Sequence, residues 1–260
     1  MQRHIRDNLS SGGPDLTTSL AKRLRKSARS TTETYITYGV TETLFKSAAA
    51  QAPYEIPEDQ RQGILTGKGP PKTAEGEDLG VPQNESWWFT TLGLQPTFST
   101  WSQVTFLHMY ILTVKLRTLE GVSAFQSYQR YLLEHFSSAA EDKMIIEHGM
   151  SARGIRNRYL KDLFLQWRGI LAAYDEGLIK GDAVLAGAVW RNMWKGKEDI
   201  DWEKVAMVVA YMRRTISTLD KVDIQDIVTV LDGVDGLWEG SNKGLDKIVK
   251  SMSAGTSQTL

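Results

Sequence analysis

The apolar residues of this chain recur with the spacing of α-helices. Within residues 159–178 they follow the i, i+3, i+4, i+7 rhythm that places side chains on one face of a helix. These positions are Tyr159, Leu160, Leu163, Phe164, Trp167, Ile170, Leu171 and Tyr174. We predict an amphipathic helix that buries this face and ends at Gly177, because glycine commonly terminates helices.

Six further segments have helical spacing, and most of them begin beside a capping residue or a glycine. They are residues 32–50, residues 99–117 with Ser99 as N-cap, a stretch after Gly121 capped by Ser123, stretches after Asp182 and after Asp201, and residues 224–231. The segment 99–117 is apolar almost all round, which predicts a helix at the centre of the fold. No run alternates with period two. We therefore predict an all-α fold: a single multi-helix domain of six or more mostly antiparallel helices with an extended N-terminal arm.

Proline content divides the chain, since five of the seven prolines lie within residues 51–82 and no periodic segment does. We predict a basic N-terminal segment (1–31), an N-terminal helix (32–50), a linker or loop (51–86), the helical domain (87–240) and a flexible tail (241–260). Residues 16–32 hold five basic residues and no acidic one, as in a mitochondrial transit peptide. Asp7 and Asp15 lie upstream, so a retained basic arm and a disordered tail stay open as alternatives.

Composition excludes several kinds of site. The 31 basic and 31 acidic residues balance, so no net charge draws the chain towards nucleic acid or membrane. The absence of cysteine excludes disulfides, thiolate zinc sites and a cysteine nucleophile. The most apolar window, residues 104–114, is too short to span a bilayer. We expect a soluble protein without a transmembrane segment.

Catalytic and metal-binding patterns are not found in the sequence. Glu134-His135 and Glu147-His148 are adjacent pairs, whose side chains diverge on a helix, so we interpret them as solvated charges at helix ends. The glycines of residues 63–69 lack the spacing, the serine or threonine and the preceding strand of a phosphate loop. We predict no catalytic residue, no metal site and no cofactor.

Two groups of residues are candidates for interactions. The densest basic cluster is either a solvated face or a patch that contacts RNA phosphate or an acidic protein; it consists of Arg153, Arg156, Arg158 and Lys161. Tryptophan and arginine dominate interface hot spots, and the candidates for contact with a partner or client are Trp87, Trp88, Trp101, Asp175, Glu176, Trp190, Arg191 and Trp194. The structural alternative for Asp175 and Glu176 is a cap or an ion pair with a residue such as Arg191.

Several sequence elements between residues 88 and 194 resemble a known family. They include Tyr131-Leu-Leu-Glu-His-Phe136, Tyr174-Asp-Glu-Gly-Leu178 and Trp190-Arg-Asn192, the last two in that order on consecutive predicted helices. The chain resembles the ubiquinol–cytochrome c chaperone family, and its long C-terminal extension resembles the fungal branch.

The resemblance implies a non-enzymatic protein of the mitochondrial matrix, associated with the inner membrane. It implies a heterodimer with a small helical assembly partner, contact with the mitochondrial ribosome near its tunnel exit, promotion of cytochrome b synthesis and receipt of nascent cytochrome b during assembly of respiratory complex III. The basic cluster would then meet ribosomal RNA or protein, and reversing Arg153 and Arg156 should weaken that association. The alternative function is a helical enzyme or a lipid- or quinone-binding protein with a pocket near His108 and Tyr174.

Overall fold

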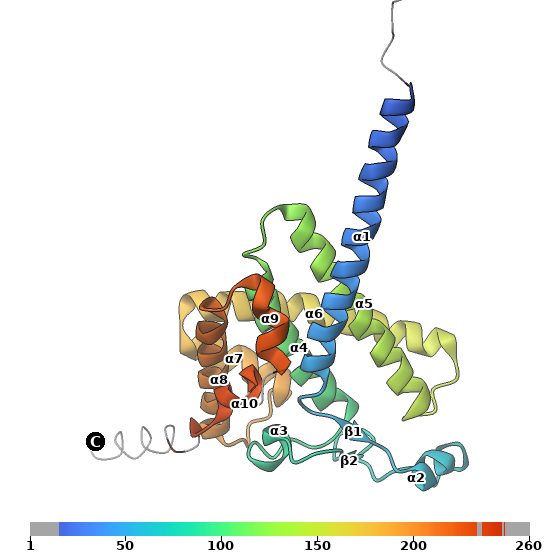
Figure 1. The fold of residues 1–260 in the computed structure, drawn as a ribbon. Helices are drawn as coiled ribbons and strands as arrows, with labels where there is room; N and C mark the ends of the chain where they lie inside the picture. The colour runs from blue at the N-terminus through green and yellow to red at the C-terminus, as the bar shows by residue number, and fades with distance from the viewer. Residues whose placement is uncertain (1–15, 233–235, 246, 248–260) are drawn as a thin grey trace, which may run out of the picture.

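The computed structural model describes residues 16–232, 236–245 and 247 (Figure 1). Within these residues the chain is built from helices and one two-stranded ribbon, which confirms the predicted all-α fold. The predicted basic segment 1–31 and the predicted tail 241–260 lie partly outside the described residues. None of the described helices combines the length and apolar character that crossing a bilayer requires.

The described helices follow one another with short connections from residue 87 onward. They are α1 (Leu16–Ala49), α2 (Glu58–Gly63), α3 (Trp87–Thr90), α4 (Phe98–Leu116), α5 (Val122–Ile146), α6 (Arg153–Lys180), α7 (Asp182–Met193), α8 (Trp202–Asp220), α9 (Ile227–Asp232) and α10 (Leu237–Asn242), with 3-10 turns at Ile64–Thr66 and Ile224–Asp226.

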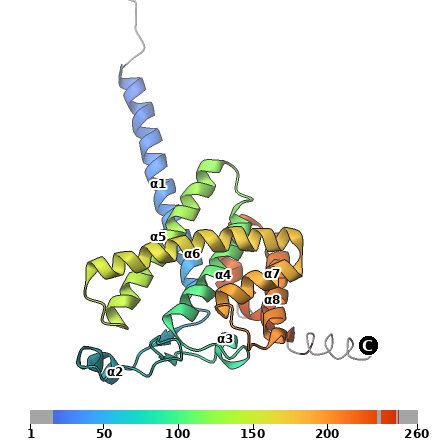
Figure 2. The same cartoon turned by 180° about the vertical axis from the view of Figure 1, so that it is seen from behind.

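Helix α4 lies at the centre of the fold, as its apolar sequence predicted. It packs against α1, α5, α6, α7 and α8, which surround it in both views (Figures 1 and 2). Residues 101–113, Lys115 and Leu116 of this helix are all buried. The predicted N-cap at Ser99 is wrong: Thr97 caps the helix, its side chain accepting a hydrogen bond from the Thr100 amide.

The other helix starts agree with the sequence to different degrees. Asp201 caps α8 as predicted, accepting a hydrogen bond from the Glu203 amide, and α7 begins at Asp182. The predicted cap at Ser123 is wrong, because α5 starts at Val122, directly after Gly121. Gly121 has a φ of 92°, a left-handed conformation that glycine adopts without strain.

Helices α6 and α7 form a tight hairpin, and Gly177 has a different role there from the one predicted. Helix α6 continues past it to Lys180, and the chain reverses at Gly181, where φ is 109°. A Cβ on Gly177 would lie 2.6 Å from the Cα of Leu185. The glycine therefore permits close packing of the two helices instead of ending the first.

Residues 51–86 lie against the base of the helices. Strands β1 (Tyr54–Glu55) and β2 (Val81–Pro82) pair antiparallel, and the side chains of Tyr54 and Ile56 are fully buried. Helix α1 leads into this region at its C-terminal end, and its N-terminal part extends away from the body of the molecule (Figure 1).

Candidate interaction surfaces

The basic cluster predicted from the sequence lies on the first three turns of α6. The side chains of Arg153, Arg158 and Lys161 are exposed, and none of them forms an ion pair with another described residue. Their charge is therefore free to attract an anionic or acidic partner.

Arg156 belongs to the fold and not to this free cluster. Its Nε donates to Glu141 at 3.0 Å, and its Nη1 donates to the carbonyls of Met150 and Ser151. The guanidinium thus joins the end of α5, the connecting turn and the start of α6. Reversing its charge would disturb this connection, so Arg156 does not serve as a surface probe.

The carboxylates Asp175 and Glu176 have structural partners, although not the one expected from the sequence. Asp175 accepts two hydrogen bonds from the guanidinium of Arg117, at 2.7 and 2.8 Å, and one from the hydroxyl of Tyr110. These bonds join α6 to the C-terminal part of α4. Glu176 pairs with Lys180, one turn later on α6. Arg191 is exposed on the neighbouring helix and contributes to lowering the pKa of Glu176, after the stronger effect of Lys180.

The candidate tryptophans are mostly core residues. Trp88 and Trp101 are buried, and Trp87 is half-buried, stacking on Tyr211 with ring centroids 5.5 Å apart. Trp190 is half-buried, and its Nε1 donates to the carbonyl of Lys197. The exposed tryptophan among the described residues, Trp202, was not singled out from the sequence.

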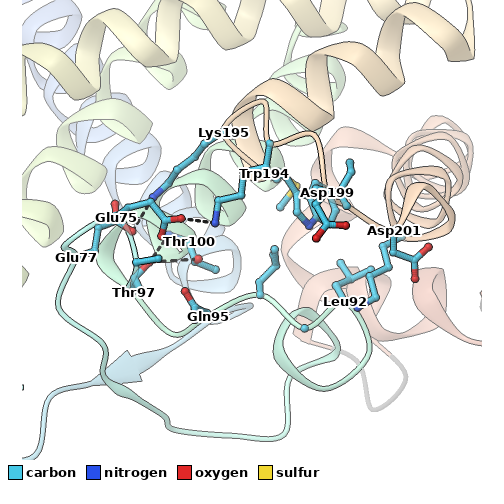
Figure 3. Close-up of a pocket in the computed structure, with 17 residues that line it drawn as sticks. Glu75, Glu77, Leu92, Gln95, Thr97, Thr100, Trp194, Lys195, Asp199 and Asp201 are labelled. Atoms are coloured by element: carbon cyan, nitrogen blue, oxygen red, sulfur yellow. Dashed lines mark hydrogen bonds and ion pairs between the residues drawn. The ribbon is translucent and has the colours of Figure 1, made fainter. Parts of the chain in front are cut away.

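Trp194 lines a cavity of about 370 Å³ between the segment after α3, residues 74–77 and the turn joining α7 to α8 (Figure 3). Lys195 pairs with Glu77 at 2.7 Å, and Lys197 pairs with Glu75, along one wall. Because these charges neutralise each other, we assign them to holding the turn against the body. Figure 3 shows Glu75, Glu77 and Lys195 lying together at this wall.

The residues of the alternative pocket, His108 and Tyr174, are both fully buried, and neither lines this cavity. His108 donates from Nδ1 to the carbonyl of Val104 at 2.7 Å and accepts at Nε2 from the hydroxyl of Tyr211 at 2.8 Å. Burial lowers the pKa of His108 to about 3. It is a neutral core residue with both ring nitrogens bonded.

The interpretation of the two Glu-His pairs as solvated charges at helix ends is wrong for His135, which is buried in the middle of α5 with its Nε2 3.2 Å from the hydroxyl of Thr41, and for Glu147 and His148. His148 is buried, donating from Nδ1 to Asp78 and accepting at Nε2 from the hydroxyl of Tyr54, each at 2.7 Å. Glu147 accepts from the backbone amide of Ile56 at 2.8 Å. Both side chains fasten the β1–β2 region to the end of α5, and the partners lie 70 or more residues away in the sequence. No group of three potential metal ligands occurs within the described residues.

The apolar face predicted for α6 is only partly buried. Its core-facing residues include Leu163, Trp167 and Ile170, whereas Tyr159 and Phe164, which we assigned to the same face, are exposed. Leu165 and Ile179 are exposed as well. Helix α6 therefore presents both cations and apolar side chains on its outer side, a combination that the sequence analysis did not identify.

Comparison with known proteins identifies the family. The family model described as ubiquinol-cytochrome C chaperone matches residues 90–230, more than half of the chain. The chain belongs to the ubiquinol–cytochrome c chaperone family. This confirms the resemblance seen in the sequence and extends it beyond Trp194 into α9.

The relatives that the chain matches include proteins of a fungus and of animals. Protein CBP3, mitochondrial, of Saccharomyces cerevisiae is 33% identical over 153 residues, 59% of this chain and 45% of the relative. Ubiquinol-cytochrome-c reductase complex assembly factor 1 of Xenopus laevis is 32% identical over 144 residues, 54% of this chain and 68% of the relative. The human protein of that name is 29% identical over 145 residues, 54% of this chain and 45% of the relative. The chain thus spans about half the length of the yeast and human relatives. No solved structure matches it.

The family match contains α4 to α8, and with them the whole of α6. Strands β1 and β2 and helix α10 lie outside it, yet Tyr54, Ile56 and Trp238 belong to the same buried core. In this member of the ubiquinol–cytochrome c chaperone family, flanking segments therefore complete the domain.

Proposed function

We propose that the protein is a non-enzymatic assembly chaperone for newly made cytochrome b of respiratory complex III. In this proposal it resides in the mitochondrial matrix at the inner membrane, acts with a small helical partner at the tunnel exit of the mitochondrial ribosome, and promotes cytochrome b synthesis. The observation that carries the proposal is the family match over residues 90–230. The names of the relatives, which include a mitochondrial protein and complex III assembly factors, support it.

The surface of α6 offers the chemistry that such a chaperone needs. Ribosomal RNA exposes phosphate groups, which attract lysine and arginine whatever the RNA sequence. Arg153, Arg158 and Lys161 supply exposed cations that form no ion pair with another described residue. Apolar side chains exposed beside them, among them Ile155 and Tyr159, can contact a hydrophobic client or a helical partner.

The test uses mitochondria that lack the protein and are complemented with variants. We expect the loss of the protein to reduce newly made cytochrome b and assembled complex III, measured by pulse labelling and native electrophoresis. Normal amounts of both would refute the proposed function.

Contact with the ribosome is tested by the double variant Arg158→Glu with Lys161→Glu. We expect roughly a tenfold loss of co-sedimentation with mitochondrial ribosomes at low salt, because two attractive charges become repulsive, and a smaller difference from the parent chain at high salt, where these charges are screened. The matched control is Lys68→Glu with Lys221→Glu, two exposed lysines elsewhere that form no ion pair with a described residue. Unchanged sedimentation of the α6 variant, or an equal loss in the control, would remove ribosome contact from this cluster.

A further inference from the structure

The side of α6 opposite the core carries a row of exposed apolar residues, which we call the outer stripe. Buried residues of α6, such as Leu163, Trp167 and Ile170, face inward. At about 100° per residue, positions seven apart return to the same side of a helix. Leu165, Ala172 and Ile179 have this spacing and are exposed, with 53% of Leu165 and 85% of Ile179 accessible to solvent.

No described element covers this side. Figure 2 shows α6 running across the outside of the molecule, in front of the helices on which it packs. Between Leu165 and Ala172 lies Gly169, and a Cβ built on it meets no atom within 4 Å. At Gly169 no side chain projects from α6, so the backbone of a second helix can approach closely there.

The charges along the stripe are predominantly positive and unsatisfied. Arg158, Lys161 and Arg168 lie on this side of α6, are exposed and form no ion pair with a described residue. Two acidic residues also lie on this side: Glu176, which is paired with Lys180, and Asp162, which is exposed. By contrast, the arginines that face other elements are used inside the fold, as Arg117 is by Asp175.

We propose that the outer stripe of α6 (Leu165, Ala172 and Ile179, with Arg158, Lys161 and Arg168 beside them) docks an amphipathic helix of a partner protein that carries acidic side chains next to its apolar face. The inference rests on the proposed function in taking this helix to belong to the small assembly partner.

The composition of the stripe favours this occupant over others. Nucleic acid could use the cations near the start of α6, as in the proposed ribosome contact, but it would leave Leu165 and Ile179, further along the helix, in water. A second copy of the chain would bring two positively charged stripes together. Apolar side chains that recur every two turns suit a helix packed along α6 better than an extended peptide. Such a helix would contact them with its own side chains at positions i, i+3, i+4 and i+7.

The test places a photo-crosslinking amino acid, p-benzoylphenylalanine, at position 172 of the full chain in mitochondria. The crosslinked peptide is identified by mass spectrometry. We expect one helical segment of a small protein, with aspartate or glutamate flanking its apolar positions, and a yield that falls at high salt. The variant Leu165→Ser with Ile179→Ser should lower the yield about tenfold, since exposed aliphatic anchors of an interface are removed.

The matched control is Ile36→Ser with Val122→Ser, which removes two aliphatic side chains that are 59% and 72% exposed on other helices. It should leave the crosslink unchanged, and the melting temperatures of both pairs should equal that of the parent chain. A second variant, Lys161→Glu with Arg168→Glu, tests the stripe through charge alone and should also lower the yield.

Several outcomes would overturn the proposal: a crosslink to ribosomal RNA, to lipid, to a second copy of the chain or to a segment without flanking acids, no crosslink, or a crosslink insensitive to both α6 variants. Failure of the proposed function would be seen separately, as normal complex III in mitochondria without the protein. Loss of complex III without the expected crosslink would refute only the assignment of the stripe.

Discussion

At the scale of residues, several polar side chains of this protein are paired with partners from distant parts of the chain. His108 in α4 meets Tyr211 in α8, and His148 after α5 meets Tyr54 in β1. Asp175 in α6 binds Arg117 at the end of α4. The sequence indicates that such groups need partners, but the choice of partner depends on which helices become neighbours. For that reason Arg191 was the wrong expectation for Asp175.

The neutral state of His108 predicts a pH dependence of stability. In the unfolded chain its pKa is near 6.5, whereas in the folded protein it is about 3. Between these values the unfolded state binds a proton that the folded state does not. The free energy of unfolding should therefore fall as the pH drops below about 6.5, and His108 should contribute up to ~1.4 kcal/mol per pH unit to this fall. Above pH 6.5 the contribution of His108 should not change with pH.

Denaturant unfolding at pH 7.5 and 5.0 measures this contribution when the parent chain is compared with His108→Asn. The variant should be less stable at pH 7.5, because hydrogen bonds inside the core are altered, but it should lose less stability on acidification. Equal losses in the two proteins would contradict the assignment of His108 as a buried neutral imidazole.

At the scale of elements, the contact of α6 with α7 depends on the absence of a side chain at Gly177. We expect Gly177→Ala to lower the free energy of unfolding by about 1–3 kcal/mol, because its Cβ would overlap Leu185 and force the helices apart. Gly169→Ala in the same helix meets no neighbour and should raise it by about 0.5–1 kcal/mol, since alanine favours the helix. Thermal unfolding of both variants provides the measurement, and equal effects would show that the close contact is not needed.

The positions of the helices could be predicted from spacing, whereas several of their ends could not. Gly177 has the sequence character of a terminator, but in the structure its small size serves packing and Gly181 makes the turn. Tyr159 and Phe164 fit the apolar rhythm of α6, yet the helix has more apolar positions than one face can bury. Periodicity identifies a helix, but it does not show which of its apolar residues a neighbour covers.

At the scale of the whole molecule, one cluster of buried apolar side chains extends from Leu44 in α1 to Leu245 beyond α10. We therefore predict that the chain unfolds in a single cooperative transition, with calorimetric and van't Hoff enthalpies in agreement. Two resolved transitions in a calorimetric scan would instead mean that α1 or the segment after α9 unfolds on its own.

The family could be recognised from short sequence elements, because those elements are read directly from the chain. The candidate surface could be predicted only in part. Arg158 and Lys161 are exposed as a binding patch requires, but Arg156 is used inside the fold. The exposed Leu165 and Ile179 were not identified, since their accessibility depends on the position of α6 at the outside of the assembled helices.

The enclosure of α4 bears on how genetic variants of this protein should be interpreted. Because Trp101, Leu107 and the other buried residues of this helix reach no solvent, a substitution there acts on a binding partner only through the amount of folded protein. Cells carrying such an allele would resemble cells with reduced expression of the protein and would respond to raised gene dosage. A substitution at Leu165 that leaves the abundance of the protein normal should not be rescued by raised gene dosage. Gene dosage therefore distinguishes substitutions in the buried α4 from substitutions on the exposed side of α6.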